Sequence, residues 1–339
     1  MSLDGAMAVR EQVLERLRED RRFVLATHEH PDGDALGSLV AVHELLGALG
    51  KDALMYVSPS DLPLPSEYSV FALEGAIHEP PPDIAERTVV FLDCGNIDRN
   101  SASVLRDGAR LLNIDHHHDN TRFGTLDYVV SDASCTAEIV WDLMHGLELE
   151  PSLAAAQAMY IGLITDTGRF MYENTGPRAH LMAAELIVAG VDVAGIYRQL
   201  YEDVPVEKLA LMALALGAIQ RFDEGQLTVA ALSADDFDAT GADEHYSEGI
   251  VDQLRAVRGT KVAVFVRELT GERRGQRKVS LRATDDHVDV SAIARAQGGG
   301  GHRRAAGFST TLDVDDLIAF LRPAVAAQLQ ADERPAALA

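Results

Sequence analysis

Acidic and imidazole side chains follow short apolar runs at several points of this sequence, and that pattern restricts the possible fold more than any other feature. Residues 110–118 read Arg-Leu-Leu-Asn-Ile-Asp-His-His-His. Such an apolar run is typical of a buried strand, so Asp115, His116 and His117 should lie just beyond its carboxyl end, where open α/β sheets bind ligands. The stretch alone leaves two interpretations open. It is a polar turn, or it is a metal or phosphate site, because imidazole and carboxylate together suit manganese, iron or zinc.

The same pattern occurs near the N-terminus. Residues 23–27 predict a strand, and the loop after it carries His28, Asp32 and Asp34 before a helix predicted over residues 39–49. Either Asp alone would be explained as a helix cap, because Asp is favoured there and the helix dipole stabilises it. Helix capping does not account for a His and two Asp together.

Two further carboxylates occupy comparable positions. Residues 88–93 form a β-rich run that ends in Asp93, and Gly95 and Asn96 follow it as turn residues. A helix predicted over residues 153–164 leads to Asp166, which on its own would be read as a simple helix terminator.

Length and composition predict a soluble α/β protein of two domains. The chain has 339 residues, of which 47% are hydrophobic and 24% charged, and a typical domain has roughly 100 to 200 residues. Helical spacing dominates the middle of the chain, and strand signals return after Gly225. We expect an N-terminal α/β domain with a parallel sheet over residues 1–190, a helical connector over 191–222, a smaller C-terminal α/β domain over 223–330 and a disordered tail over 331–339.

The sequence also favours one compartment. No apolar run approaches the ~18 residues of a membrane span, and the N-terminus lacks a basic-then-apolar secretory pattern. Cys94 and Cys135 are the two cysteines, too few for a disulfide framework, which fits a reducing cytoplasm. We expect a cytoplasmic protein with no membrane partner.

Charge is distributed unevenly along the chain. The formal net charge of −23 argues against a protein that coats nucleic acid nonspecifically. Residues 255–304 nevertheless hold 12 Lys or Arg against 5 Asp or Glu, which suggests an anionic ligand there. A solvated hairpin around Gly271 and Gly275 would explain the same charges, and both interpretations stay open.

A glycine-rich stretch lies in the same region. Residues 298–307 read Gly-Gly-Gly-Gly-His-Arg-Arg-Ala-Ala-Gly. Consecutive glycines let backbone amides approach an anion closely, and the His and two Arg add positive charge. A flexible linker is the alternative, but linkers are not usually sited inside a compact domain beside such residues. We interpret the stretch as an anion site.

The polar residues at the predicted element ends form one set if the fold brings those ends together. They are His28, Asp32, Asp34, Asp93, Asp115, His116, His117 and Asp166. Carboxylates this close would repel one another and need raised pKa values or bound cations. Two divalent metals roughly 3.5 to 4 Å apart, bridged by one carboxylate, would neutralise them and supply an activated water. Such a centre favours in-line hydrolysis at phosphorus.

In chain order, these residues resemble the four motifs of the DHH phosphoesterase superfamily. The motifs are His28-x-x-Pro-Asp32-x-Asp34, Asp93, Asp115-His116-His117 and Asp166. Residues 299–307 resemble the motif of the associated C-terminal substrate domain, with one glycine more than that motif before His302. The resemblance covers nearly the whole chain. It is greatest to the bacterial nano-RNases, which also hydrolyse 3′-phosphoadenosine 5′-phosphate or the linear products of cyclic di-AMP.

The resemblance implies a metal-ligand set and a catalytic set. One metal would be held by His28, Asp32 and Asp93, and the second by Asp34, Asp93, His116 and Asp166, so that Asp93 is the bridge. The catalytic residues would be Asp93, Asp115, which orients His116, and His117, which faces the phosphoryl group. His118 has no assigned role.

The resemblance also implies where the substrate binds and what it is. Arg282, Gly299, Gly300, Gly301 and His302 would bind the far end of a substrate held in a cleft between the two domains. With two divalent ions, most often manganese and otherwise magnesium or cobalt, the enzyme would release mononucleotides from short RNA oligonucleotides, 3′-phosphoadenosine 5′-phosphate or di-AMP. Long duplex nucleic acid would not be a partner, and a homodimer is an expected assembly.

Two alternatives remain at this point. An inorganic pyrophosphatase or exopolyphosphatase of the same superfamily would share the metal motifs, although the glycine-rich loop with His302 favours a nucleotide. A non-catalytic nucleotide sensor would bind without turnover, although every metal-ligand type is retained.

Overall fold

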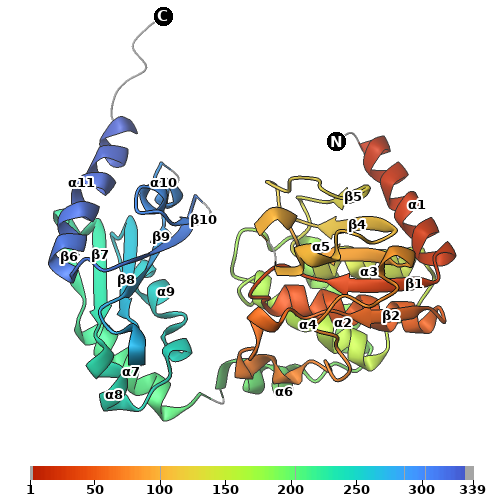
Figure 1. The fold of residues 1–339 in the computed structure, drawn as a ribbon, viewed down its shortest axis with the longest axis horizontal. Coiled ribbons are helices and arrows are strands. Elements are labelled where there is room, and N and C mark those ends of the chain that lie inside the picture. The colour runs from red at the N-terminus through yellow and green to blue at the C-terminus, as the bar shows by residue number, and fades with distance from the viewer. Residues whose placement is uncertain (1–2, 100, 203, 286, 302, 333–339) are drawn as a thin grey trace, which may run out of the picture. The chain divides into compact units, whose positions relative to one another are not determined.

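The computed structural model describes residues 3–99, 101–202, 204–285, 287–301 and 303–332. The chain forms two compact units, residues 1–203 and residues 204–339. Each unit has its own sheet and its own helices (Figure 1), and each is described by itself.

The N-terminal unit is built on a five-stranded parallel sheet with the order β2-β1-β3-β4-β5. Its strands are β1 (Arg22–Ala26), β2 (Asp52–Met55), β3 (Thr88–Leu92), β4 (Arg110–Asp115) and β5 (Leu126–Val129). β3 is buried along its whole length and β1 except at its first residue, as expected for central strands covered on both faces. The strand order reverses between β1 and β3, and this is the position where open α/β sheets bind ligands.

Alternating side chains of these strands enter two hydrophobic cores. Leu25 and Val90 join a large core with helices of the unit, whereas Val24 and Phe91 enter a smaller core beneath the 3-10 turn Ser101–Leu105. The helices are α1 (Leu3–Glu19), α2 (Gly33–Ala48), α3 (Thr136–Gly146), α4 (Leu153–Asp166), α5 (Pro177–Val188) and α6 (Val193–Tyr197). Figure 1 shows α2, α3 and α4 grouped along the sheet.

Helices α2 and α4 approach each other closely because glycines lie between them. A Cβ atom at Gly37 would be 2.4 Å from the carbonyl oxygen of Ala158, and one at Gly162 would be 2.8 Å from Oδ1 of Asp34. Both distances are shorter than real Cβ contacts, so any larger residue would push the helices apart. The close contact brings the beginning of α2, with Asp34, next to the last turns of α4, which ends at Asp166.

The C-terminal unit is built on a six-stranded sheet with the order β10-β11-β9-β8-β7-β6. The strands are β6 (Gln220–Phe222), β7 (Leu227–Leu232), β8 (Val262–Glu268), β9 (Arg277–Ala283), β10 (Gly300–Gly301) and β11 (Ala305–Thr310). β7 and β8 are parallel, and the other neighbours are antiparallel.

Helices cover both faces of this second sheet. They are α7 (Val206–Gly217), α8 (Ala234–Thr240), α9 (Ile250–Arg255), α10 (Val290–Arg295) and α11 (Val314–Asp332). One core joins α7, α8 and α9 to the sheet through Leu211, Phe237 and Leu254, and the other joins α10 and α11 through Ile293 and Leu321. The predicted α/β class, with a parallel N-terminal sheet and a smaller C-terminal α/β domain, is confirmed.

The segment expected as a separate helical connector, residues 191–222, is divided between the two units. α6 packs into the N-terminal core through Ile196, whereas α7 packs into the C-terminal unit and the segment ends in β6. At the other end of the chain, α11 runs to Asp332, and the predicted tail from residue 333 onward lies outside the described residues. A location of the active site between the two domains stays a prediction.

None of the described helices is, by itself, long and apolar enough to cross a membrane. The bent pair Pro177–Val188 and Val193–Glu202, at 114°, satisfies length and composition only when taken together.

Candidate metal centre

Three neighbouring strands of the N-terminal sheet end side by side, and each is followed by predicted site residues. β1 leads to His28, β3 to Asp93, and β4 ends at Asp115. Because these strands are parallel and adjacent, the side chains gather at the carboxyl edge of the sheet. The beginning of α2 and the end of α4 add Asp34 and Asp166 to the same group.

The two carboxylate oxygens of Asp93 face two different groups of side chains. Oδ2 is 3.5 Å from Nε2 of His28, which is itself 3.9 Å from Oδ1 of Asp32. Oδ1 is 3.5 Å from Nε2 of His116, which is itself 3.7 Å from Oδ2 of Asp166. Asp93 thus stands between two sets of potential ligand atoms, as a bridging carboxylate must.

The spacing of these atoms fits shared ions. Sets whose ligand atoms all lie within 4.8 Å of one another are His28 with Asp32 and Asp93, Asp34 with His116 and Asp166, and Asp93 with His116 and His117. Contacts of 3.5 to 3.9 Å are long for hydrogen bonds. Two ligands that each lie ~2.1 Å from one ion are about 3.0 Å apart at a right angle and up to about 4.2 Å apart across the ion. The donor atoms therefore fit two divalent ions of the imidazole-and-carboxylate class.

The electrostatics of the centre also favour cations. Burial and the charges of Asp93 and Asp166 raise the pKa of Asp34, and burial with the charges of Asp93 and Asp32 raises the pKa of Asp166 to about 8. Burial lowers the pKa of His28, but the nearby carboxylates of Asp32 and Asp93 outweigh it and raise that pKa to about 12. Within the described chain, no Lys or Arg pairs with Asp32, Asp34, Asp93 or Asp166. The centre attracts positive charge that only its imidazoles now supply.

The first turn of α3 holds two of the carboxylates, a role that the sequence interpretation missed. Backbone amides of Thr136 and Ala137 donate to the two oxygens of Asp34 at 2.7 and 2.9 Å. The Thr136 hydroxyl donates to Oδ1 of Asp93 at 2.9 Å. Amides at a helix start have no partner within the helix, and the helix dipole is positive there, so they stabilise carboxylates. Thr136 opens a predicted helix, and that position was the available signal.

Asp115 orients His117, and the expectation that it orients the ring of His116 is wrong. Oδ1 of Asp115 lies 2.7 Å from Nδ1 of His117 but meets only the backbone amide of His116, at 2.8 Å. Residues two apart on an extended chain point to the same side, and the residue between them points away. The His116 ring instead places Nδ1 3.4 Å from the carbonyl oxygen of Ala133.

The contact with Asp115 also sets the charge and the available atom of His117. Burial lowers the pKa of His117, but the hydrogen bond to Asp115 and the charge of Asp93 raise it to about 9. With Nδ1 against Asp115, Nε2 is the atom with which the ring can meet a phosphoryl oxygen.

Two asparagines outside the predicted set also contact its carboxylates. Nδ2 of Asn120 donates to Oδ2 of Asp115 at 2.5 Å. Nδ2 of Asn174 donates to Oδ2 of Asp166 at 3.2 Å and to the carbonyl oxygen of Ser134 at 2.8 Å. In the sequence both look like ordinary loop residues, and nothing local distinguishes them.

The predicted substrate-binding residues lie in the C-terminal unit. Arg282 is on β9, where Nη1 donates to the carbonyl oxygen of Leu281 at 3.1 Å and Nε is 3.7 Å from Oδ1 of Asp252. His302 lies outside the described residues.

The three predicted glycines differ in what the fold requires of them. A Cβ atom at Gly299 would lie 2.2 Å from the carbonyl oxygen of Gly307, and one at Gly301 would lie 2.6 Å from that of Ala305. The pairing of β10 with β11 therefore requires glycine at both positions. Among the described residues, no atom lies within 4 Å of a Cβ built at Gly300, so none of them fills the space beside the backbone there.

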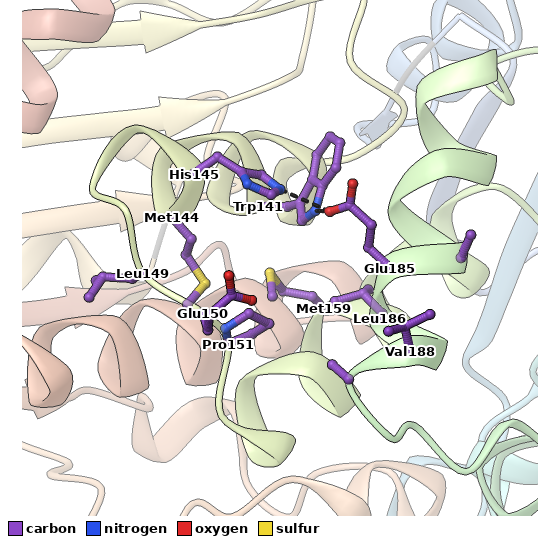
Figure 2. Close-up of a pocket in the computed structure, with 12 residues that line it drawn as sticks. Trp141, Met144, His145, Leu149, Glu150, Pro151, Met159, Glu185, Leu186 and Val188 are labelled. Carbon is purple, nitrogen blue, oxygen red and sulfur yellow. Dashed lines mark hydrogen bonds and ion pairs between the residues drawn. The ribbon is translucent and has the colours of Figure 1, made fainter.

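A separate cavity of about 540 Å³ lies among α3, α4 and α5 of the N-terminal unit (Figure 2). Trp141 and Met159 line it, and Oε2 of Glu185 accepts hydrogen bonds from Trp141 at 3.0 Å and His145 at 2.9 Å. None of the lining residues belongs to the metal-ligand sets.

Comparisons with known proteins agree with the fold and the centre. The DHH family, N-terminal domain, matches residues 22–163, and the DHHA1 domain matches residues 224–327. The bifunctional oligoribonuclease and PAP phosphatase NrnA of Thermus thermophilus is 36% identical over 310 residues, which cover 90% of this chain and 89% of that protein. The Bacillus subtilis protein of the same name is 26% identical over 292 residues, 85% of this chain and 88% of that protein.

A solved structure extends the likeness to the fold of both units. An exopolyphosphatase-related protein from Bacteroides fragilis has a TM-score of 0.86 at 22% identity, with 96% of this chain and 98% of that chain covered. The fold and the centre define a metal-dependent phosphoesterase. The chain belongs to the DHH phosphoesterase family, whose members are hydrolases that use divalent metals, and the resemblance found in the motifs is confirmed.

Proposed function

We propose that this protein is a two-metal phosphoesterase that hydrolyses short RNA oligonucleotides, 3′-phosphoadenosine 5′-phosphate, or cyclic or linear di-AMP to mononucleotides. The relatives from T. thermophilus and B. subtilis bear the names of an oligoribonuclease and PAP phosphatase, and the chain matches most of their length. Within this chain, the proposal rests above all on Asp93, whose two oxygens face two separate sets of ligand atoms.

Six side chains would hold the ions, with Asp93 shared between both. His28, Asp32 and Asp93 are assigned to one ion, and Asp34, Asp93, His116 and Asp166 to the other. When bound, two such ions supply an activated water and stabilise charge on a phosphoryl group. The first turn of α3 keeps Asp34 and Asp93 in register through three hydrogen bonds.

His117 and Asp115 would act on the substrate side of the centre. With a pKa of about 9, His117 is cationic near neutral pH. Its Nε2 can therefore donate a hydrogen bond to an equatorial phosphoryl oxygen as negative charge develops there. Asp115 is fully buried and contacts His117 rather than substrate, so its part is to position the imidazole.

The C-terminal unit would bind the distal part of the substrate. Arg282 offers a guanidinium that the described residues engage only weakly, and the backbone at Gly300 is open to a ligand. Gly299 and Gly301 shape that loop, and His302 completes the set. With the metal centre in one unit and these groups in the other, we expect short substrates with two anionic ends to be favoured.

The remaining features of the proposal concern metal, location and assembly. Manganese is the proposed ion because three carboxylates and an imidazole make a mixed hard and borderline donor set. Cys94 and Cys135 are buried and are not joined by a disulfide, which is consistent with the cytoplasm. A homodimer formed through the N-terminal domain is proposed from the family resemblance, and sedimentation analysis would test it.

One substrate panel tests the proposed function. The purified protein is incubated with a 5′-phosphorylated dinucleotide, 3′-phosphoadenosine 5′-phosphate, cyclic di-AMP and pyrophosphate, each with manganese and with chelator. We expect manganese-dependent release of mononucleotide from at least one nucleotide substrate. Hydrolysis of pyrophosphate alone would show an inorganic phosphatase, and binding of nucleotide without turnover in manganese would show a sensor.

A further inference from the structure

The segment that follows Asp166 adopts a backbone conformation that its residues do not favour. Gly168, Arg169 and Phe170 all have left-handed φ values, of 54°, 62° and 65°. Glycine reaches this region without cost, but for an Arg and a bulky Phe it is strained. Strained backbone persists where surrounding contacts impose it, and it is concentrated at sites that bind or react.

Several contacts impose this conformation. The carbonyl oxygen of Thr167 accepts hydrogen bonds from the amides of Met171 and Tyr172, both at 3.0 Å, and Oγ1 of Thr167 accepts one from the Phe170 amide at 3.2 Å. The Phe170 ring stacks on His180 of α5 with 5.0 Å between ring centroids. The base of the loop is therefore fixed.

The result of this anchoring is that two large side chains remain exposed. Met171 is 67% exposed and Tyr172 49% exposed. Phe170, between them and α4, is partly buried instead. The strained turn sends one aromatic ring inward as an anchor and holds the next aromatic ring at the surface.

The loop that carries the exposed Tyr172 ring is joined to Asp166 of the metal centre at both of its ends. A Cβ atom at Gly168 would lie 2.4 Å from the Tyr172 ring, so the ring rests on the backbone two residues beyond Asp166. Two residues further on, Asn174 donates to Oδ2 of Asp166 at 3.2 Å. The ring thus belongs to a short loop that starts just after Asp166, a member of one of the ligand sets, and is tied back to it by Asn174.

We propose that residues 168–172 form a nucleobase platform, on which the Tyr172 ring stacks against the base of the nucleotide whose phosphate lies at the metal centre, with Met171 flanking it. This inference rests on the proposed function and extends it to the base. A purine or pyrimidine is the ligand class that fits, because stacking on an aromatic side chain needs only a π face and tolerates any base sequence. The platform would let one centre accept oligonucleotides of mixed sequence.

The test varies the side chain at position 172 and, separately, removes each base of the substrate. Steady-state kinetics are measured for wild type, Tyr172→Phe, Tyr172→Trp and Tyr172→Leu. The substrates are a 5′-phosphorylated ApA dinucleotide and its two singly abasic analogues. We expect Tyr172→Leu to raise KM for the dinucleotide by about 10- to 100-fold, the usual scale for one base stack, with kcat nearly unchanged. Phe and Trp should retain a wild-type KM.

The abasic substrates separate stacking from a structural effect. Tyr172→Leu should leave KM unchanged for the analogue that lacks the stacked base, and the manganese dissociation constant should match that of wild type. An equal loss on all three substrates, or weaker manganese binding, would mean that Tyr172 acts by supporting Asp166, and the platform would be refuted. An unchanged KM for the dinucleotide would refute it as well.

The same data distinguish failure of the platform from failure of the proposed function. Wild-type turnover of the dinucleotide with a normal Tyr172→Leu variant overturns the platform alone. Absence of wild-type turnover on every nucleotide overturns the proposed function, and the platform with it. Because Tyr172 is half exposed, the variants should fold, and matched melting temperatures would verify this.

Discussion

The metal centre of the N-terminal unit and the basic hairpin of the C-terminal unit each contain several charges of one sign. They differ in whether side chains of opposite charge pair with those charges. In the hairpin between β8 and β9, Arg273 is 3.0 Å from Oε1 of Glu244, and Arg274 pairs with Asp235 and Asp238. In the centre, the carboxylates have imidazole neighbours and, within the described residues, no Lys or Arg partner. Unbalanced charge therefore marks a binding site better than charge density does.

The same comparison bears on the two interpretations of the basic stretch at residues 255–304. Lys261 pairs with Asp285 at 2.6 Å, and Arg277 donates to the carbonyl oxygen of Leu312 at 3.0 Å. Together with the hairpin pairs, these contacts engage several cations of the stretch within the unit, as in an ordinary solvated face, and anion binding stays a prediction. Arg282 differs, because among the described residues its ion pair is the long contact of 3.7 Å with Asp252, and it remains the proposed substrate contact.

The largest expected effect comes from the residue that joins the two ligand sets. Asp93→Asn keeps the size of the side chain but removes the charge shared by His28 and His116. We expect kcat/KM on a dinucleotide to fall by at least about 10³-fold, since the stabilisation of transition-state charge depends on both ions. Manganese stoichiometry, measured by calorimetric titration, should fall below two. Near-normal activity with two bound ions would contradict the bridging assignment. Asp235→Asn, which changes a hairpin pair, is the matched control and should retain full activity.

A smaller loss is expected when the support of the centre is weakened. Thr136→Val removes the hydroxyl that donates to Asp93 at 2.9 Å but keeps the amide that binds Asp34. Loss of such an outer contact typically costs about 10- to 100-fold in metal affinity or activity, and we expect that range for manganese affinity. Thr136→Ser should restore most of it because the hydroxyl returns. If valine and serine gave the same loss, packing rather than the hydrogen bond would be responsible.

The sequence predicted the strand-end residues well because those signals are local. A short apolar run followed by Asp or His identifies both the strand and the edge at which its polar residue lies, and this held at β1, β3 and β4. Residue chemistry then indicated metal ligation without any knowledge of distances. The fold brings the predicted residues into three overlapping groups, one of which also contains His117, and the division into two ligand sets stays a prediction.

The missing parts depend on contacts between distant segments. Thr136 and Asp34 are about a hundred residues apart, and no local pattern connects them. The sequence analysis predicted no strand at β11, because Ala305–Thr310 contains Phe308 as its one large apolar residue. Its strand conformation comes from pairing with β9. The partner of Asp115 was misassigned because adjacency in the chain does not say which of two neighbouring rings points the same way.

Proton competition should make metal binding depend on pH. Asp166 has a folded pKa of about 8, above its ordinary 3.8, so between those values the folded protein holds a proton that the unfolded chain has lost. The stability contribution of this group is therefore greatest at low pH and falls as pH rises toward 8. His28, with a pKa raised from 6.5 to about 12, has the same sign above pH 6.5. Metal must displace these protons, so its affinity should rise with pH.

Calorimetry at pH 6.5, 7.5 and 8.5 measures this competition. We expect manganese affinity to increase about tenfold per pH unit for each proton displaced. The melting temperature in chelator should fall over the same range while the stabilisation by manganese grows. The carboxylates would be already ionised if manganese affinity were the same at all three pH values. The observed binding enthalpy would then also be the same in buffers of different ionisation enthalpy, because no proton is released. Asp235→Asn again serves as a control, because its pair lies far along the chain from the centre.

The smallest effect is expected in the hairpin, where the comparison predicts that removing a paired charge does not change catalysis. Arg274→Gln removes a guanidinium whose partners, Asp235 and Asp238, belong to the same unit and are exposed. Exposed ion pairs contribute little to stability because water and salt screen them, so the melting temperature should change only slightly. Substrate kinetics should be unchanged at both low and high salt. Arg282→Gln, made in parallel, should raise KM for the dinucleotide, since that guanidinium has only a long contact with a described carboxylate. A substantial rise in KM for Arg274→Gln would mean that the hairpin releases its arginines to the substrate, and paired charge would no longer distinguish structural from binding residues in this protein.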